Sequence, residues 1–299
     1  MKKDKQYIKA MLAAFGVYTL WGFSFMASKI GQERATPFLL LAYRFDIAIL
    51  ILSIPVIFGK IKVRLKGKNI KPLLLLGTCE PCIYFIGEQY GLRFSNAAFS
   101  GVMIAIIPIV TLIMATMFLK DKPSKAQWAF SILSIAGIIV ITLAESSGGS
   151  VSLAGVVFLS VAVLAGSAYG VISRGISDEF TVFERSYVMQ IMGAVFYTVL
   201  ALIEYHGDMR EVLSPLSDGS FALSALYLAI GASVLGYTLF NYAVSNAPMA
   251  NVISLCNLTT VISVVSGVVL LSEPFSAVSA VAIGAVLVGI WGVQKYSPE

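Results

Sequence analysis

The sequence predicts an all-α polytopic membrane protein with ten transmembrane helices, arranged as two inverted five-helix repeats. Composition is the first observation behind this prediction, because hydrophobic residues make up 58% of the 299-residue chain and charged residues only 12%. A water-soluble fold of this length cannot bury so much apolar surface, whereas a chain solvated by lipid need not. The other two observations are a pattern of residues that occurs twice and an uneven distribution of lysine and arginine between the loops.

Ten apolar segments approach the roughly 20 residues that a helix needs to cross a bilayer. They are 8–30, 38–58, 71–92, 97–119, 125–144, 153–174, 182–204, 221–244, 250–271 and 275–294. The first segment follows Lys2, Lys3 and Lys5 in the manner of a signal peptide. No small-x-small cleavage site follows it, so we expect a retained span. The glycine- and serine-rich stretch 146–150 is expected to link a first repeat, 1–145, to a second, 150–299.

The two halves carry matching residues at a constant shift of 152 positions. The shift aligns Gly137 with Gly289 and places Asp121 and Glu273 in equivalent turns. The turn around Asp121 contains lysines, whereas the turn around Glu273 contains none. Because cytoplasmic loops are enriched in lysine and arginine, this difference indicates that the two equivalent turns face opposite sides of the membrane.

The basic residues also predict the orientation of the whole chain. Of the 21 lysine and arginine residues, four are expected on one side of the membrane, namely Lys29, Arg34, Arg93 and Arg210. Arg44 lies inside a predicted span, and the remaining sixteen flank the spans on the other side. An excess of this size marks the cytoplasmic side. Both termini are therefore expected in the cytoplasm of a cell-membrane protein, and the second five-helix unit starts from the opposite face.

The order and spacing of several residues resemble two EamA-type repeats of the drug/metabolite transporter superfamily. The residues that carry the resemblance are Trp21, Gly22, Phe23, Ser24, Phe25 and Lys29 in the first span, Arg44, Tyr90, Gly91, Leu92, Pro108 and Asp121 later in the first half, and Tyr169, Arg174, Tyr242 and Glu273 in the second. The second half departs from the first in having Thr260 where the first has Pro108. The resemblance implies a secondary transporter, commonly an exporter, of amino acids, related metabolites or cationic drugs.

Arg44, Asp46, Glu80 and Glu88 are the candidate functional residues among the ionisable groups within predicted spans, where charge is costly and usually faces a cavity or a partner. Arg44 and Glu88 are expected at comparable depth, so that they could form a pair that either holds two helices together or contacts substrate. Asp46 and Glu80 lie nearer the midplane. Glu80 precedes Pro81, which removes a backbone donor, and we expect this carboxylate to bind a cationic substrate or a proton.

Aromatic and amide side chains are the other candidate substrate contacts. Tyr18, Trp21 and Phe25 share one face of the first span, and Tyr84 lies one turn from Glu80. The second half supplies polar edges from three further residues, Tyr169, Tyr237 and Asn241. Asn257 belongs to a polar stripe on the ninth segment, and such a stripe either joins helices or binds substrate.

Other classes of protein fit the sequence less well. The single histidine, His206, and the isolated Cys79–Cys82 pair give no metal, cofactor or redox site, and no phosphate-binding loop is present. We therefore expect no enzyme and no nucleic-acid partner. The expected partners are a small-molecule substrate, protons as a candidate coupling ion and the lipid bilayer, with the chain a monomer or a weak homodimer. The alternatives are a sugar-phosphate or nucleotide-sugar exchanger, a membrane enzyme on lipid-linked substrates, and a channel or receptor.

Overall fold

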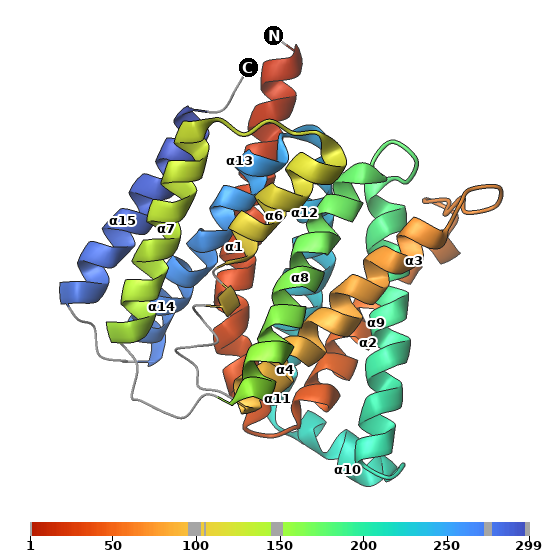
Figure 1. Ribbon diagram of the computed structural model, residues 1–299. Coiled ribbons are helices and arrows are strands. Elements are labelled where there is room, and N and C mark those ends of the chain that lie inside the picture. Colours follow the sequence, from red (N-terminus) through yellow and green to blue (C-terminus); the bar gives the residue numbers. More distant parts are fainter. Residues whose placement is uncertain (1, 95–102, 105, 145–151, 272–276, 297–299) are drawn as a thin grey trace.

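A computed structural model describes residues 2–94, 103–104, 106–144, 152–271 and 277–296. These residues form helices and their connections, without a strand. The helices make one bundle. The first helix begins and the last helix ends at the same end of this bundle (Figure 1). At that end the Tyr7 hydroxyl approaches the side chain of Gln294.

The first half consists of helices that match the first five predicted segments over their described residues. They are α1 (Lys2–Gln32), α2 (Pro37–Ile57), α3 (Lys71–Gly77), the π-helical turn η1 (Thr78–Ile83), α4 (Tyr84–Arg93), α6 (Ile107–Met114), the π-helical turn η2 (Ala115–Leu119) and α7 (Lys125–Ala144). The predicted segment 71–92 is thus helical but interrupted at η1, and part of the segment 97–119 lies outside the described residues.

The second half follows the same pattern. Its elements are α8 (Leu153–Gly175), α9 (Val182–Glu204), α10 (Met209–Leu213), the 3-10 turn η3 (Ser214–Ser217), α11 (Gly219–Tyr227), the π-helical segment η4 (Leu228–Leu235), α12 (Gly236–Asn246), α13 (Met249–Ser254), the 3-10 turn η5 (Leu255–Asn257), α14 (Leu258–Leu271) and α15 (Ala277–Lys295). The turn that contains Glu273 lies outside the described residues.

Five helical segments are long and apolar enough to cross a membrane: Lys5–Gln32, Pro37–Ile57, Leu153–Gly175, Val182–Glu204 and Gly219–Asn246. Shorter apolar helices cover Ile107–Leu119, Lys125–Val140, Met249–Ile262 and Ala280–Lys295. Leu50, Leu223 and Val281 are largely exposed on the outside of the bundle, while Arg185 and Asn241 are fully buried inside it. Apolar side chains on the exterior, with polar side chains turned inward, are the arrangement that lipid as solvent favours. The chain is therefore a multi-pass, all-helical membrane protein, and the full set of ten spans stays a prediction.

The first helices of the two halves run in opposite directions. α1 begins beside the end of α12, where Gln6 hydrogen-bonds Asn246. α8 ends at that same place, because Arg174 donates to the backbone carbonyl of Ala247. α8 begins at the other end of the bundle, where Ser152 donates to the carbonyl oxygen of Phe94. Inverted repeats require this relation between their first helices.

A pair of antiparallel helices, α7 and α15, joins the halves through reciprocal contacts. A Cβ atom on Gly137 would lie 2.8 Å from the carbonyl oxygen of Ala282, and one on Gly289 would lie 2.7 Å from that of Phe130. The 152-residue shift maps Phe130 onto Ala282 and Gly137 onto Gly289. The two contacts are therefore equivalent, as expected when a two-fold axis crosses the helix pair at right angles. Superposition of residues 1–145 on 150–299 stays a prediction.

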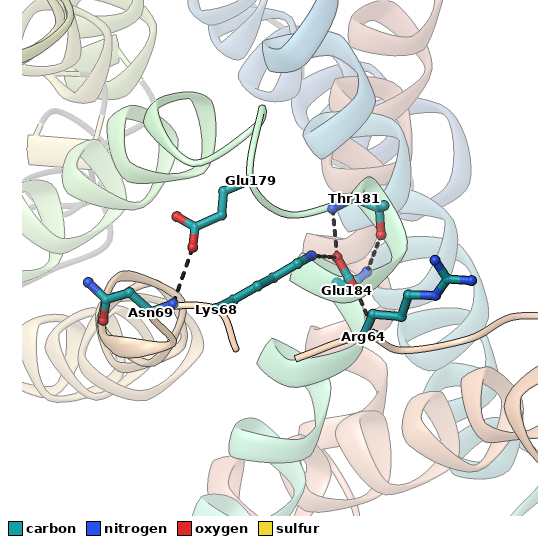
Figure 2. A network of polar contacts seen from close by, with 6 residues as sticks. All are labelled: Arg64, Lys68, Asn69, Glu179, Thr181 and Glu184. Atoms are coloured by element: carbon teal, nitrogen blue, oxygen red, sulfur yellow. Dashed lines mark hydrogen bonds and ion pairs between the residues drawn. The ribbon is translucent and has the colours of Figure 1, made fainter. Parts of the chain in front are cut away.

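A loop clasp (Arg64, Lys68, Asn69, Glu179, Thr181 and Glu184) also ties the α2–α3 loop of the first half to the α8–α9 turn of the second (Figure 2). Glu184 accepts hydrogen bonds from the backbone N–H of Arg64 at 2.8 Å and from Lys68 Nζ at 2.9 Å. It also completes a capping box with Thr181 at the start of α9. The Glu184 side chain is only 3% exposed, and hydrogen bonds from both halves of the chain stabilise its charge there.

The opposite end of the bundle has its own contacts between the halves. Thr36, which caps the start of α2, donates from its hydroxyl to Glu204 Oε2 at 2.7 Å. Arg34 forms an ion pair of 2.9 Å with Asp218. A hydrogen bond from the Phe221 backbone N–H, another from the Ser220 N–H and the nearby Arg34 guanidinium hold the pKa of Asp218 below its usual range. The packed pair α2 and α9 is therefore connected at both ends.

We expect Glu184→Gln to lower the stability of the purified protein by about 1.5–3 kcal/mol, because it removes a charge-assisted bond from a buried position. The measurement is thermal unfolding in detergent. Glu179→Gln is the matched control, since Glu179 is exposed and accepts one described backbone hydrogen bond, and it should change stability by less than about 0.5 kcal/mol. Equal effects of the two substitutions would contradict the role assigned to the clasp.

Candidate functional site

The helix that contains η1 is broken at Glu80, whose backbone is extended (φ −144°, ψ 121°) between helical neighbours. Pro81 follows and has no N–H to donate. Tyr197 of α9 donates its hydroxyl hydrogen toward the carbonyl oxygens of Pro81 (3.0 Å) and Cys82 (3.2 Å). Irregular backbone at membrane depth is tolerated where protein groups or a watery cavity satisfy it. Tyr197 adds a buried hydrogen-bond donor from α9 directly after the break.

The carboxylate of Glu80 lies inside the bundle and is bound by the second half of the chain. Its residue is 8% exposed, and its Oε1 accepts a hydrogen bond of 2.8 Å from the hydroxyl of Tyr237 on α12. A carboxylate at this depth is costly unless it is partnered, and such residues usually mark the path of a substrate or ion. The contact therefore joins the two halves through a buried polar pair.

An aromatic box (Tyr18, Trp21, Tyr169, Tyr237 and Phe240) surrounds this position. Trp21 meets Tyr237 with ring centroids 5.4 Å apart, and Tyr169 meets Tyr237 at 5.9 Å. The Trp21 indole N–H donates to the carbonyl of Ala232 at 3.0 Å, which fixes the ring in the interior. Aromatic faces attract cations, so a box beside a carboxylate is suited to a positively charged group.

Asn241, a predicted substrate contact, instead organises the wall behind the box. Its Oδ1 accepts from Tyr169 (3.2 Å) and Ser173 (2.6 Å), and its Nδ2 donates to Ser186 (2.9 Å). Arg185 donates to the Ser173 hydroxyl at 2.8 Å and to the Asn241 carbonyl at 3.0 Å. Both amide atoms of Asn241 are thus occupied by protein, and the network orients the Tyr169 ring.

Arg44 and Glu88, which could form a pair by their depth, make no direct ion pair among the described residues. Arg44 donates from Nε to the hydroxyl of Ser233 at 2.7 Å, and its guanidinium lies 5.0 Å from the centre of the Phe85 ring. Glu88 accepts a hydrogen bond of 3.0 Å from Tyr84. Depth alone was the basis of the prediction, and the ring of Phe85 provides a cation–π partner for Arg44 that depth does not reveal.

Three other predicted residues, Asp46, Tyr84 and Asn257, make their hydrogen bonds away from the Glu80–Tyr237 contact. Asp46 accepts two hydrogen bonds from the Thr198 hydroxyl on α9, at 2.9 and 3.0 Å. Tyr84 bonds Glu88 and not Glu80. Asn257 donates to Ser134 at 2.8 Å, so it joins η5 to α7. The side chain of Phe25 lies outside the described residues.

The structure adds two interior polar residues that the sequence reasoning missed. Arg185 was counted with the basic residues that flank the membrane, but it is fully buried in α9. Gln190, one and a half turns further along α9, is also fully buried. Both lie in a predicted span, and the argument that polar residues within spans face the interior would have found them.

The geometry describes a helical membrane protein whose interior holds a carboxylate and an aromatic box between two similar halves. Comparison with known proteins identifies the class. The sequence model of the EamA-like transporter family matches residues 8–143 and again 153–294. The chain belongs to this family of transporters, and the predictions of a transporter rather than an enzyme are confirmed.

Similar proteins are transporters by name. The "Uncharacterized transporter YcxC" of Bacillus subtilis (strain 168) is 28% identical over 289 residues, covering 96% of this chain and 91% of the relative. The "Uncharacterized inner membrane transporter YedA" of Escherichia coli (strain K12) is 24% identical, covering 96% and 90%. The "Probable terminal-alkyne amino-acid exporter" of Streptantibioticus cattleyicolor is 25% identical over 244 residues, covering 81% and 79%.

A solved crystal structure has the same fold. It superposes with a TM-score of 0.81 at 19% sequence identity and covers 96% of each chain. At this sequence identity, the similarity supports a shared fold and carries no information on function.

Tyr197→Phe should destabilise the protein, because it removes the buried hydroxyl that donates to the carbonyl oxygens of Pro81 and Cys82. A loss of about 1–3 kcal/mol is expected for buried groups that lose a partner. Thermal unfolding of the purified protein measures it. Tyr242→Phe serves as control, since the Tyr242 hydroxyl makes no hydrogen bond among the described residues. Unchanged stability of Tyr197→Phe would show that the break at Glu80 needs no such support.

Proposed function

We propose that the protein is a secondary active transporter that exports small organic metabolites with a positively charged amino group. Amino acids and cationic drug-like compounds are the substrate classes. The observation that carries the proposal is the Glu80 carboxylate, bonded to Tyr237 across the two halves and enclosed by the aromatic box. Glu80 binds the cationic group of the substrate, and a proton is the candidate coupling ion that competes for the same carboxylate.

The mechanism is alternating access, with the two halves rearranging around the site that they share. Tyr18, Tyr169 and Tyr237 are 1–2% exposed, so the aromatic box is closed in this conformation. Opening toward either side requires helices of the first half, which carry Glu80 and Trp21, to separate from α12, which carries Tyr237. The ten spans, the inverted repeats and the cytoplasmic position of both termini are part of the proposal. The reciprocal α7–α15 contacts support the inverted relation.

The name of one relative supports the proposed direction of transport and the proposed substrate class. The Streptantibioticus cattleyicolor protein is named as a probable terminal-alkyne amino-acid exporter. An α-amino acid carries the ammonium group that a carboxylate in an aromatic box attracts.

The runner-up is a sugar-phosphate or nucleotide-sugar exchanger. An anionic cargo of this kind calls for several free cations in the cavity. Arg185 is deep, but its guanidinium is already occupied by the hydroxyl and carbonyl groups of Ser173 and Asn241. Arg44 is then the buried cation that remains for an anionic substrate, so we rank the exchanger hypothesis lower.

Glu80→Gln tests the proposal, because it removes the charge while keeping the shape of the side chain. The variant should insert and purify as a monodisperse species, since it relieves a buried charge. Efflux of labelled amino acids from proteoliposomes should fall at least about tenfold or lose its pH dependence, as expected when a charge-assisted contact to substrate is lost.

The matched control is Asp46→Asn, which alters a carboxylate held by Thr198 away from the box. It should retain flux within about threefold of wild type, as expected for a change outside the contact. If Glu80→Gln transported at the wild-type rate at every pH, the result would contradict the proposal.

The proposed orientation is tested by labelling of single cysteines. In a protein with Cys79, Cys82 and Cys256 replaced, a cysteine at exposed Lys66 should resist an impermeant thiol reagent in intact cells. A cysteine at exposed Arg210 should react, because the proposal puts it outside the cell. Permeabilised cells provide the control, in which both positions should react. The opposite labelling pattern in intact cells would invert the topology.

A further inference from the structure

Gln190 has a side chain that the packing of the protein does not explain. The residue is 0% exposed, and neither its Oε1 nor its Nε2 has a hydrogen-bond partner. The buried amide of Gln127, by contrast, is satisfied on both sides. Its Oε1 accepts from the Ser124 backbone N–H, and its Nε2 donates to Asn251 Oδ1. A buried amide without partners costs about 1–3 kcal/mol, so a group of this kind calls for a function.

The surface of α9 places Gln190 between two contacts. Ser186, Gln190, Gly193 and Tyr197 follow the i, i+4, i+7 and i+11 spacing of one helix face. Ser186 accepts a hydrogen bond from Asn241. At the other side of Gln190, a Cβ on Gly193 would lie 2.7 Å from Pro81 Cγ. Gln190 therefore lies at a level between Asn241 and Pro81.

This level is that of the Glu80–Tyr237 contact. Tyr237 precedes Asn241 by one turn of α12, and Glu80 directly precedes Pro81. A second unpartnered polar atom lies in the aromatic box, because the Tyr18 hydroxyl is buried without a hydrogen bond. Tyr18 packs against Trp21 at 5.6 Å. An unused amide and an unused hydroxyl thus accompany the carboxylate in the interior.

We propose that Gln190 is a specificity-determining residue whose amide binds the main-chain ammonium and carboxylate groups of an α-amino acid. The inference rests on the proposed function. A primary amide offers one acceptor atom and one donor atom side by side, and an α-amino acid presents a donor and an acceptor on adjacent groups. The substrate ammonium is shared by Glu80 and Gln190 Oε1. The substrate carboxylate accepts from Gln190 Nε2 and from the Tyr18 hydroxyl.

This arrangement makes the transporter distinguish an amino acid from the amine that lacks its carboxylate. A site built to hydrogen-bond a group rejects an analogue without it, because the buried partners of that group are then left unpaired. Glu80 and the aromatic box bind the ammonium of either molecule. Gln190 and Tyr18 bind only the amino acid through a second charged group. Discrimination between the two is therefore the property that Gln190 controls.

The experiment compares wild type with Gln190→Met, which keeps length and volume and removes the amide. The probes are the twenty L-amino acids and, where one exists, the matching decarboxylated amine, tested by thermal stabilisation of the purified protein and by competition in proteoliposome counterflow. For the amino acid that binds best, wild type should prefer it over its amine by at least about tenfold, the effect of one charge-assisted hydrogen bond. Gln190→Met should bring that ratio to within about threefold of unity.

The same substitution at a satisfied amide separates recognition from folding. Without probe, Gln190→Met should unfold at the wild-type temperature or above, because it removes an unpartnered polar group. Gln127→Met should unfold at a lower temperature and keep the wild-type preference, since it breaks bonds to Ser124 and Asn251. A Gln190→Met protein that keeps the wild-type ratio, or that is destabilised as Gln127→Met is, would overturn the inference.

The outcomes also separate this inference from the proposed function. If Glu80→Gln abolishes transport while Gln190→Met leaves the preference unchanged, the transporter proposal stands and the assignment of Gln190 falls. If wild type neither transports nor is stabilised by any amino acid or amine, both proposals fall together.

Discussion

The hydrogen bond between Glu80 and Tyr237 is the interaction on which the site depends, because it places a carboxylate of the first half on a hydroxyl of the second. A carboxylate in the interior of a membrane protein is retained at a cost. Here one donor, the Tyr237 hydroxyl, stabilises the carboxylate, and the surrounding aromatic rings present faces that favour a cation beside it. The backbone is extended at Glu80, and Tyr197 hydrogen-bonds the carbonyl oxygens of the two residues that follow.

The frame around the site is held together at three places where the two halves meet. The loop clasp buries Glu184 at one end of α9, and Arg34–Asp218 joins the halves at the other end. Away from α9, Gly137 and Gly289 permit α7 and α15 to approach closely, with equivalent contacts on each helix (Figure 1). These contacts hold the halves together in this conformation, and the proposed alternating access requires the helices that bear Glu80, Trp21 and Tyr237 to rearrange.

The helical, multi-pass architecture could be predicted from the sequence, because the length of the apolar segments depends on the solvent and not on side-chain packing. The missing backbone donor of Pro81 pointed to the irregular backbone at Glu80, and the shared face of Tyr18 and Trp21 pointed to their packing together. Partners were harder to predict. Arg44 bonds Ser233 instead of Glu88, because its neighbours come from helices far apart in the chain. Arg185 was missed because a basic residue near a span end is counted as a flank until its burial is known, and Gln190 was missed because only charged residues and selected amides within the spans were considered.

Glu80 and Tyr237 are proposed to form one binding element, and a double-mutant cycle measures whether they do. The affinity for the best-binding amino acid is measured for wild type, Glu80→Gln, Tyr237→Phe and the double variant. We expect an interaction free energy of about 0.5–3 kcal/mol, the range for residues that share a network. Additive effects within about 0.3 kcal/mol would mean that the two residues act independently, and would contradict the account.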